Sequence, residues 1–370
     1  MAKKWKTALT NAFLRGYVAL TRRLQDPRTL KADHEFRSIV IYSTTALGDL
    51  MFNTPAIRAV KQRYPQAFIT LVSSEKNRGL VAESDYFDDV IYWDEKVRDM
   101  FSVVGQLRRH NPELAIILHA KPPYDVLSAV LAGCRYILKD IYGGKPCGLE
   151  RWLANPFVRY NGHLIQRKLD LVARLGCDAG NTDMAIPVPF PLLEKEPGKI
   201  IIGFQMGASG QLRCWPVPHF IALAKKLLAQ GPHYQIVLIG TRKEAALERE
   251  FLAGMTEQER RQVVSYIDKT GLKALLGIMK NMDVMVTGDT GPLHLAIALK
   301  TPTVSLFVTA NPAHTGPYQD PALHRVIQVP LTTKNLTPEQ LRQPLCIISA
   351  EEVFERVCDV LPERRTMAAG

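Results

Sequence analysis

Residues 286–296, with the sequence VTGDTGPLHLA, lie between an apolar run and a short helical pattern. The run at 283–286 predicts a buried parallel strand, and the apolar residues of 293–299 predict a short helix. Pro292 suits the start of that helix, because it lacks an N–H that the first turn would leave unpaired anyway. A strand that ends in a glycine-flanked turn directs free N–H groups and the positive end of a helix dipole at one point. Such a point suits a phosphate.

Two side chains of this stretch indicate what accompanies the phosphate. Asp289 is itself an anion, so we expect it to hold hydroxyl groups attached to the phosphate-bearing ligand, which predicts a nucleotide-sugar pocket. His294 lies one turn into the helix, and we expect it to contact phosphate or hydroxyl and not to act as a base. The alternative is a tight turn in which Asp289 and Thr290 only cap the helix. This alternative is weaker, because it gives no reason for a histidine at position 294.

Length, composition and charge describe a globular protein with anionic partners. The chain of 370 residues exceeds the usual single-domain size, and its hydrophobic content of 46% supplies ample core. The net charge of +11 is typical of a protein that binds a nucleotide, a phosphorylated lipid, a membrane surface or nucleic acid. We rank nucleic acid low, because the cations are not interleaved with an aromatic platform.

The six cysteines form no CxxC pair and have no histidine at metal spacing, which predicts reduced thiols in a cytoplasm. No run of eighteen apolar residues is present, and the N-terminal stretch lacks the apolar region and cleavage site of a signal peptide. We therefore expect a cytoplasmic protein without a spanning helix.

The N-terminal stretch 3–31 is strongly basic, with Asp26 as its single acid. Its apolar residues recur at spacings of four and three, which predicts one face of a helix. One interpretation is a helix that lies in a membrane interface, where acidic head groups meet the cations. The other is a helix packed on the first domain, with the same stripe as its core contact. The stripe consists of Trp5, Leu9, Phe13, Tyr17, Leu20 and Leu24.

From residue 38 short apolar runs alternate with helical patterns, which indicates a parallel sheet covered on both faces. A proline-rich stretch, IPVPFP at 186–191, is typical of an interdomain linker, and the alternation restarts after it. We expect strands at 38–43, 68–72, 90–93, 114–119, 135–138, 199–204, 235–239 and 303–307. We expect helices at 50–63, 77–83, 96–109, 124–132, 164–175, 218–229, 243–252, 272–280 and 349–360.

These patterns predict an α/β protein whose two halves face each other across a cleft, with ligands off the carboxyl ends of the strands. The expected parts are a basic amphipathic extension (1–36), two Rossmann-like domains (37–185 and 186–348) and a C-terminal helical segment (349–370).

Two further turns are candidates for the cleft. Residues 44–49, TTALGD, place Asp49 at the start of a helix, where the dipole favours its anion as a proton acceptor. A role as a helix cap is equally consistent with this position. Residues 205–216, QMGASGQLRCWP, offer the Ser209 hydroxyl and the Arg213 guanidinium to a phosphate. The alternative here is a flexible loop with a solvated arginine.

Several common motifs are missing from the sequence. It has no GxGxxG or GxxxxGK[ST] fingerprint, no GxSxG elbow and no HExxH pair. It also lacks an Asp-x-Asp pair that would offer two carboxylates to a divalent cation. We therefore expect a diphosphate to be held by backbone N–H groups and Arg213, with no metal and no cofactor.

With these turns in view, the sequence resembles glycosyltransferase family 9, the ADP-heptose:lipopolysaccharide heptosyltransferases, over roughly residues 37 to 361. The resemblance rests on three ordered motifs. They are ALGD at 46–49 followed by NTPAIRA at 53–59; GAS at 207–209 with Trp215, Pro216 and Phe220; and GDTGPLHLA at 288–296 followed by PTVSLF at 302–307 and PAHTGPY at 312–318.

The resemblance implies a GT-B fold, with the acceptor on the first Rossmann-like domain and the nucleotide sugar on the second. The C-terminal helix would cross back toward the first domain. It also implies an inverting, metal-independent transfer of a heptose from ADP-heptose to the lipopolysaccharide inner core. Such an enzyme would be cytoplasmic and peripheral on the inner membrane, with 3–31 as a possible membrane contact.

The resemblance also implies roles for single residues. Asp49 matches the family's proposed base, and Arg213 and Ser209 match groups that compensate the charge of the leaving ADP. Asp289 would hold sugar hydroxyls. The backbone N–H groups of Thr290 and Gly291, together with His294, would face the diphosphate. His119 and Lys121 are acceptor candidates by position only, with a solvated loop as their alternative.

The sequence departs from the family at two places. The loop 210–214 is less basic than the family's pattern, and the N-terminal 34 residues lie outside the resemblance. Two other functions stay open. One keeps the chemistry with a different nucleotide sugar or glycan acceptor, since a fold does not fix a substrate. The other is a nucleotide-sugar-binding protein without catalysis.

Overall fold

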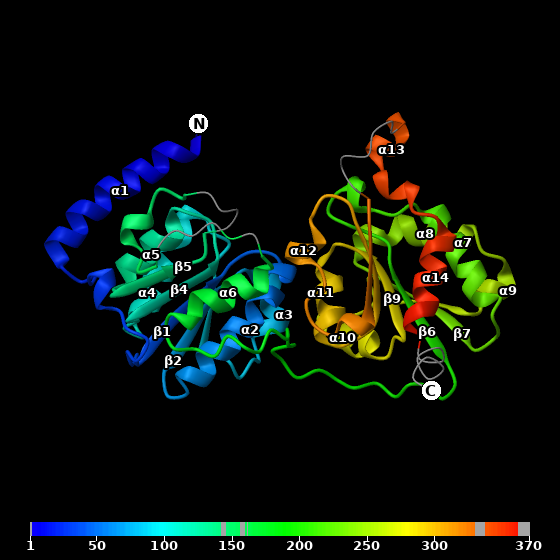
Figure 1. The fold of residues 1–370 in the computed structure, drawn as a ribbon, viewed down its shortest axis with the longest axis horizontal. Helices are drawn as coiled ribbons and strands as arrows, with labels where there is room; N and C mark the ends of the chain where they lie inside the picture. The colour runs from blue at the N-terminus through cyan, green and yellow to red at the C-terminus, as the bar shows by residue number, and fades with distance from the viewer. Residues whose placement is uncertain (1, 142–145, 156–159, 161, 330–336, 362–370) are drawn as a thin grey trace. The chain divides into compact units, whose positions relative to one another are not determined.

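The computed structural model describes residues 2–141, 146–155, 160, 162–329 and 337–361. The chain forms two compact units, Met1–Val188 (unit 1) and Pro189–Gly370 (unit 2), and Figure 1 shows the helices and strands of each. Each unit is built around one parallel sheet. The prediction of an α/β protein with two parallel sheets is therefore confirmed.

The sheet of unit 1 has the strand order β3-β2-β1-β4-β5, and every neighbouring pair is parallel. This is the order of a Rossmann-like domain, in which the direction of winding reverses between β1 and β4. The strands are β1 (Ser38–Ser43), β2 (Phe68–Ser73), β3 (Asp89–Tyr92), β4 (Leu114–His119) and β5 (Tyr136–Lys139). The helices are α1 (Ala2–Thr21), α2 (Leu47–Arg63), α3 (Arg78–Val81), α4 (Met100–Arg108), α5 (Tyr124–Ala132) and α6 (Leu164–Ala173).

The central strands of unit 1 are apolar because helices cover both faces of the sheet. All six residues of β1 are buried, as expected for a parallel strand between two helical layers. Side chains alternate across a strand, so Val40 and Tyr42 join one core cluster with α4 and α5. Ile39 and Ile41, which are also fully buried, point to the opposite face. The helices α2 and α6 pack against each other.

The sheet of unit 2 has the order β11-β10-β9-β6-β7-β8, again with parallel pairs only. The winding reverses between β6 and β9. The strands are β6 (Ile200–Gln205), β7 (Tyr234–Ile239), β8 (Val263–Ser265), β9 (Val284–Gly288), β10 (Thr303–Phe307) and β11 (His324–Gln328). The helices are α7 (Val217–Leu228), α8 (Ala245–Ala253), α9 (Glu257–Arg260), α10 (Leu272–Lys280), α11 (Gly291–Ala298), α12 (Pro312–Thr315), α13 (Pro338–Arg342) and α14 (Ala350–Val360).

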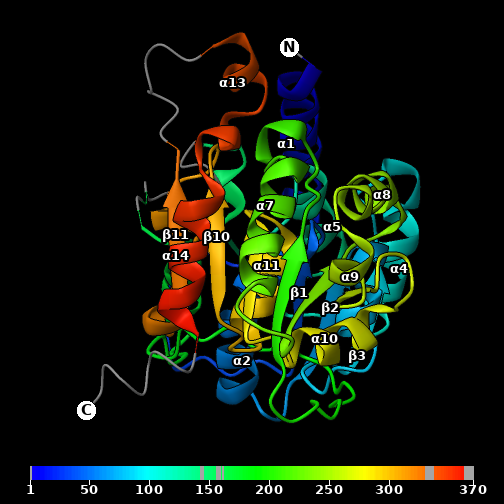
Figure 2. The same cartoon turned by 90° about the vertical axis from the view of Figure 1, so that its right-hand side faces the viewer.

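The C-terminal helix α14 packs on unit 2. Ser349 caps it, because its hydroxyl accepts a hydrogen bond of 3.1 Å from the Glu352 N–H. Val353, Val357 and Val360 are fully buried in the core cluster of unit 2. Figure 2 shows α14 beside β10 and β11, and it also contacts α7. A crossing of this helix back toward the first domain stays a prediction.

Helix α1 packs on unit 1, but only part of the stripe expected from the sequence, Tyr17 and Leu24, packs against the core. Its contact face holds Leu14, which is fully buried, and Thr10. Asn11 donates a hydrogen bond of 2.7 Å to the Gly148 carbonyl and accepts one of 2.7 Å from the Trp152 indole. The interpretation in which the whole stripe forms the core contact is therefore wrong. Four of its members are exposed: Trp5, Leu9, Phe13 and Leu20.

Within the described ranges, every helix is too short or too polar to cross a bilayer.

Candidate functional site

A cavity of about 1200 Å³ lies at the carboxyl ends of the strands of unit 1. Segments that follow all five strands contribute to its wall, and so does α1. Ligands of doubly wound sheets bind off the carboxyl ends of the strands, where the winding reverses. The lining residues include Lys4, Thr7, Thr44, Asp49, Glu95, His119, Lys121, Lys139 and Asp140.

Asp49 reaches this cavity from the first turn of α2. The helix begins at Leu47, three residues earlier than expected, so Asp49 is its third residue. One carboxylate oxygen, Oδ2, accepts a hydrogen bond of 3.2 Å from the Ala46 N–H. The other, Oδ1, lies 3.5 Å from His119 Nδ1. The capping alternative is therefore correct for one oxygen, and the second oxygen faces a residue of the cavity wall.

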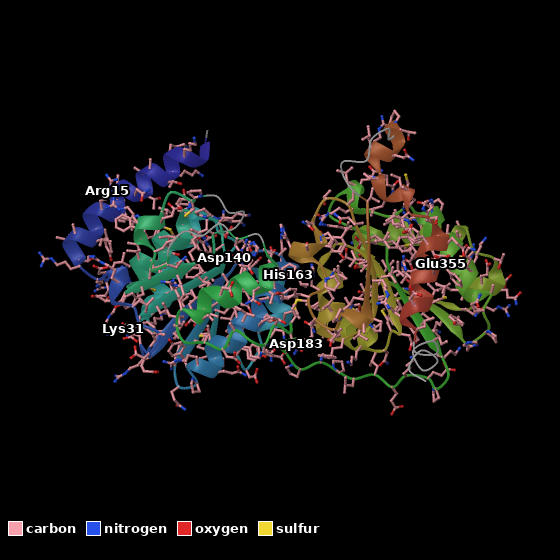
Figure 3. The ribbon with its side chains drawn as sticks, in the orientation of Figure 1. Arg15, Lys31, Asp140, His163, Asp183 and Glu355 are labelled. Carbon is pink, nitrogen blue, oxygen red and sulfur yellow. The ribbon has the colours of Figure 1, made fainter. Side chains whose placement is uncertain are left out.

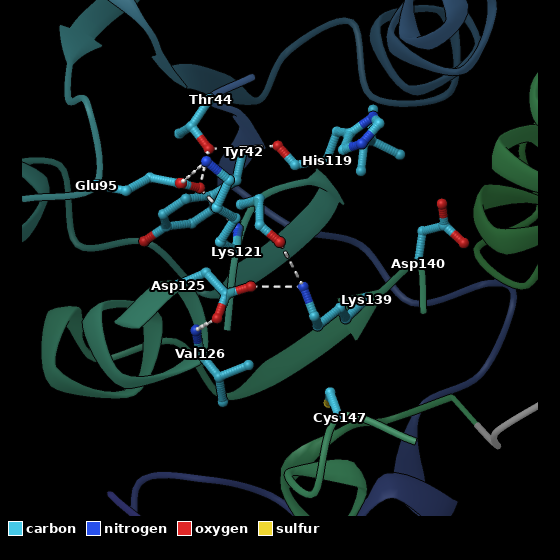
Figure 4. A network of polar contacts seen from close by, with 12 residues as sticks. Tyr42, Thr44, Glu95, His119, Lys121, Asp125, Val126, Lys139, Asp140 and Cys147 are labelled. Atoms are coloured by element: carbon cyan, nitrogen blue, oxygen red, sulfur yellow. Dashed lines mark hydrogen bonds and ion pairs between the residues drawn. The ribbon is translucent and has the colours of Figure 1, made fainter. Parts of the chain in front are cut away.

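His119 ends β4 and lies beside Asp49 in the wall of the cavity. Figure 4 labels His119 and the polar residues around it. Its side chain is 10% exposed. Burial lowers the pKa of His119 to about 4, and the Lys168 cation acts in the same direction against the attraction of Asp49. The imidazole is therefore neutral near pH 7, and the contact joins a neutral ring to a carboxylate.

This lowered pKa predicts a pH dependence of stability. As the pH falls from 6.5 to about 4, the unfolded chain binds a proton at His119 that the folded protein does not. Stability therefore decreases over that window, by at most about 3 kcal/mol. Urea unfolding at pH 7 and pH 5 measures it, and the variant His119→Gln should lose less stability between these two values than the wild type. An equal loss in both proteins would contradict this origin.

Lys121 and Glu95 join the loops on either side of the cavity. The Glu95 carboxylate accepts hydrogen bonds of 2.6 Å from the Thr44 hydroxyl and 2.6 Å from the Lys121 N–H (Figure 4). Its second oxygen lies 3.6 Å from Lys121 Nζ, although the lysine side chain is 72% exposed. Lys121 is thus a partner of Glu95 at the rim. No pattern in the sequence selects Glu95, whose backbone has a φ of 61°.

Two buried lysines support the end of β4, and sequence reasoning missed both. Lys139 pairs with Asp125 and donates a hydrogen bond of 3.1 Å to the Ala120 carbonyl (Figure 4). Lys168 is fully buried, pairs with Asp140 and donates to the Leu118 carbonyl. The carbonyls on both sides of His119 are therefore held by ammonium groups.

Asp140 has a second partner besides Lys168, because Arg167 Nε lies 2.8 Å from its other carboxylate oxygen. Burial alone would raise the pKa of Asp140, but the neighbouring Lys168 and Arg167 cations lower it below its usual value. Asp140, labelled in Figure 3, therefore stays ionised beside the cavity. It follows β5 directly, so its position at a strand end is the signal that would have selected it.

In unit 2 the corresponding reversal of winding lies between β6 and β9, and the predicted donor residues gather there. The Gln205 side-chain oxygen accepts hydrogen bonds from the hydroxyls of Thr287 (2.8 Å) and Thr290 (3.1 Å). Thr290 is the N-cap of α11 but its side chain makes no capping bond. The helix begins at Gly291, so Pro292 is its second residue and not its first. Gln205, the last residue of β6, was also missed.

Arg213 connects the two loops of this second site. One guanidinium nitrogen donates a hydrogen bond of 3.0 Å to the Asp289 carbonyl, and the other donates to the Ser209 hydroxyl. A Cβ on Gly288 would lie only 2.8 Å from the Arg213 carbonyl oxygen, so this glycine permits a close approach of two backbones. His294 is buried, and its Nε2 lies 3.9 Å from Asp289 Oδ1.

Burial raises the pKa of Asp289, while Arg213 opposes the change. A buried carboxylate does not suit an anionic partner but suits hydroxyl groups, because they satisfy it without adding charge. The structure thus brings Ser209, Arg213, Asp289, Thr290, Gly291 and His294 to one end of the sheet of unit 2.

Comparison with known proteins gives the family. The model of glycosyltransferase family 9 (heptosyltransferase) matches residues 159–340. The lipooligosaccharide heptosyltransferase 2 of Haemophilus influenzae is 30% identical over 355 residues, which cover 88% of this chain and 99% of that protein.

Solved structures agree on the fold. The E. coli ADP-heptose lps heptosyltransferase II has a TM-score of 0.67 at 24% identity, with 89% of this chain and 100% of that chain covered. The E. coli heptosyltransferase WaaC with ADP has a TM-score of 0.65 at 17% identity, with 86% and 96% covered. The two parallel α/β units therefore have the GT-B fold of these enzymes. The sequence match with the Haemophilus relative and the fold match with the E. coli enzyme each extend over nearly the full length of those proteins. This chain is therefore a glycosyltransferase that belongs to family 9, the heptosyltransferases.

Proposed function

We propose that this enzyme transfers a heptose from ADP-heptose to the inner core of lipopolysaccharide, with inversion at the anomeric carbon and without a metal ion. The name of the Haemophilus relative supports the sugar and the class of acceptor. The WaaC structure with ADP supports the nucleotide. The observation that carries the proposal is the position of Asp49 in the wall of a cavity of about 1200 Å³, a size that accommodates sugar residues.

Asp49 is the proposed general base. Its carboxylate takes the proton of the acceptor hydroxyl while that oxygen attacks the anomeric carbon of the heptose. The new C–O bond forms as the bond from the anomeric carbon to the diphosphate oxygen breaks, and ADP leaves with the electron pair. The Ala46 N–H fixes one carboxylate oxygen, and His119, also a candidate acceptor contact, lies beside the other.

The donor site is proposed for the ends of β6 and β9. The N–H groups of Thr290 and Gly291 lie at the start of α11, where a diphosphate is favoured by the helix dipole. Arg213 and Ser209 compensate the charge that develops on the leaving ADP. Asp289 holds heptose hydroxyls, and His294 contacts the diphosphate. In this scheme the enzyme works in the cytoplasm, on the inner membrane that carries its acceptor.

A panel of nucleotides tests the donor. Thermal unfolding is measured with ADP, UDP, GDP and dTDP and with the corresponding sugars. We expect ADP and ADP-heptose alone to raise the midpoint, because a ligand at a hundred times its Kd stabilises by about 2.7 kcal/mol. Selective stabilisation by UDP or dTDP would replace ADP-heptose with another donor. Transfer of radiolabelled heptose to heptose-deficient lipopolysaccharide then tests the acceptor.

Two substitutions of Arg213 are expected to separate the effect of its positive charge from the effect of its two-pronged contact. Arg213→Gln should lower kcat/KM by about 10²- to 10³-fold, because it removes compensation of the leaving diphosphate. Arg213→Lys should recover only part of this loss, since lysine restores the charge but not the two-pronged contact. Arg261→Gln is the control, because that side chain is 79% exposed on the same unit. A normal kcat/KM in Arg213→Gln would remove Arg213 from the donor site.

A further inference from the structure

Helix α1 presents an apolar stripe to solvent. Trp5, Leu9, Phe13 and Leu20 are 58%, 63%, 51% and 86% exposed, and their spacings of four, four and seven place them on one face. Scattered apolar residues on a surface need no explanation, but a continuous stripe of large ones marks an interaction surface. The side chains of this stripe include aromatic rings, which favour the boundary between water and lipid.

The helix is fixed to unit 1 by its other face, so the stripe is directed outward. Leu14 is buried in the core cluster of unit 1, and Asn11 bridges Gly148 and Trp152. Thr7 packs closely on Gly148, because a Cβ added to this glycine would lie 3.0 Å from the Thr7 methyl group. Figure 1 shows α1, in dark blue, along the outside of unit 1. The exposed stripe is therefore a property of the docked helix.

The charges around the stripe identify the partner. The stretch 3–31 has Asp26 as its only acid, and Lys4, Arg15 and Arg22 are exposed (Figure 3 labels Arg15 and Lys31). A second copy of this chain would bring like charges together, which opposes self-association. An anionic lipid surface complements them, because basic residues near such a surface are attracted to its head groups. An apolar stripe flanked by cations is the pattern of a helix lying in the plane of an anionic bilayer.

The same helix is part of the wall of the cavity that holds Asp49. Lys4 and Thr7 line that cavity together with Asp49 and His119. The first two turns of α1 thus have one side toward the cavity and the outward side, with Trp5, toward solvent. A bilayer in contact with the stripe would lie next to the cavity rim formed by Lys4.

We propose that α1 lies in the interface of an anionic bilayer and that this contact places the acceptor cavity beside its lipid-anchored substrate. The first half of this proposal, that α1 docks on the bilayer, is argued from the stripe and its charges alone. The second half, that docking delivers the acceptor to the cavity, rests on the proposed function. One helix then serves both as the membrane contact and as a side of the cavity.

Vesicle binding tests the docking half. Co-sedimentation is measured with vesicles of phosphatidylethanolamine and phosphatidylglycerol, and with vesicles of phosphatidylcholine. We expect the wild type to bind the anionic vesicles, and the double variant Phe13→Ser/Leu20→Ser to bind them about tenfold or more weakly. Arg15→Glu should weaken binding to the anionic vesicles only. The control is Phe101→Ser/Leu192→Ser, which removes two side chains exposed by 70% and 76% elsewhere and should bind like the wild type.

Because Phe13 and Leu20 are exposed, the double variant is expected to keep the thermal midpoint of the wild type. Equal vesicle binding by wild type and double variant would overturn the proposal. So would light scattering that shows a wild-type dimer which the double variant loses, because the stripe would then be an interface between copies.

Kinetics with two forms of the acceptor test the delivery half. We expect the double variant to show a roughly tenfold higher KM for acceptor embedded in vesicles, and an unchanged KM for the deacylated, water-soluble acceptor. An unchanged KM for both forms would overturn delivery. If the wild type transfers to neither form, the proposed function fails, while the vesicle measurement still decides whether α1 docks.

Discussion

Asp49→Asn is expected to reduce kcat for heptose transfer by about 10²- to 10⁴-fold, the range that a positioned general base contributes. The asparagine has nearly the same shape, and its side-chain oxygen can still accept from the Ala46 N–H that now bonds to Oδ2. It cannot take a proton from the attacking hydroxyl. The loss should therefore appear in kcat, with the start of α2 preserved.

Binding of the donor separates a lost base from a damaged protein. The proposed donor residues all belong to unit 2, so ADP should raise the thermal midpoint of Asp49→Asn as it raises that of the wild type. Asp170→Asn is the matched control, because Asp170 is exposed on α6, and it should transfer at the normal rate. A kcat near the wild-type value in Asp49→Asn would mean that another group accepts the proton.

Lys168→Met is expected to lower the free energy of unfolding by about 3–5 kcal/mol, the range measured when one partner of a buried ion pair is removed. Lys168 is fully buried, and its ammonium group contacts both Asp140 and the Leu118 carbonyl. The substitution leaves the 3% exposed Asp140 with Arg167 alone and leaves a carbonyl beside His119 without its donor. Methionine fills most of the volume, so the loss comes mainly from the charge.

A double-mutant cycle in urea isolates this pair. Lys168→Met with Asp140→Asn should lose less stability than the sum of the two single variants, because the second change removes the charge that the first leaves uncompensated. Lys96→Met is the control for a lysine exposed on the same unit, and we expect a change within about 0.5 kcal/mol. Additive losses at 168 and 140 would show that the pair is not coupled.

The sequence predicted all five strands of unit 1 and the four central strands of unit 2, and it missed both edge strands of unit 2. Strands such as β1 and β9 are buried on both faces, so they are continuous apolar runs that a pattern can find. The two strands that were missed, β8 and β11, lie at the edges of the sheet of unit 2. β8 has three half-buried residues, and only two of the five residues of β11 (HRVIQ), His324 and Ile327, are buried. Edge strands depend on their neighbour more than on their own apolarity.

The site residues that can be predicted are the polar ones that lie in turns directly after buried strands. Asp49 and Arg213 were found because polar residues in turns after buried strands have few structural reasons to be there. Gln205 and Asp140 obey that rule and would have been found by applying it to the ends of β6 and β5. Lys168 obeys no local rule, because it lies inside α6 and its partner carbonyl is 50 residues away in the chain.

The N-terminal stripe shows what periodicity leaves undetermined. Its spacing correctly predicted a helix, but the buried positions turned out to be Thr10 and Leu14. Periodicity identifies a face, whereas the side that a helix buries depends on the surface that receives it. Asn11, whose side chain joins Gly148 to Trp152, belongs to that contact and carries no apolar signal at all.

The carboxylate of Glu95 also limits how the cavity proposed for the acceptor can be redesigned. It ties the loop after β3 to Thr44 after β1 and to Lys121 after β4. Exchanging one of these loops for that of a relative would leave hydrogen-bonding groups in the other two loops without their partners. Grafts that aim at a new glycan should therefore replace the three loops together, because hydrogen bonds to one carboxylate join them.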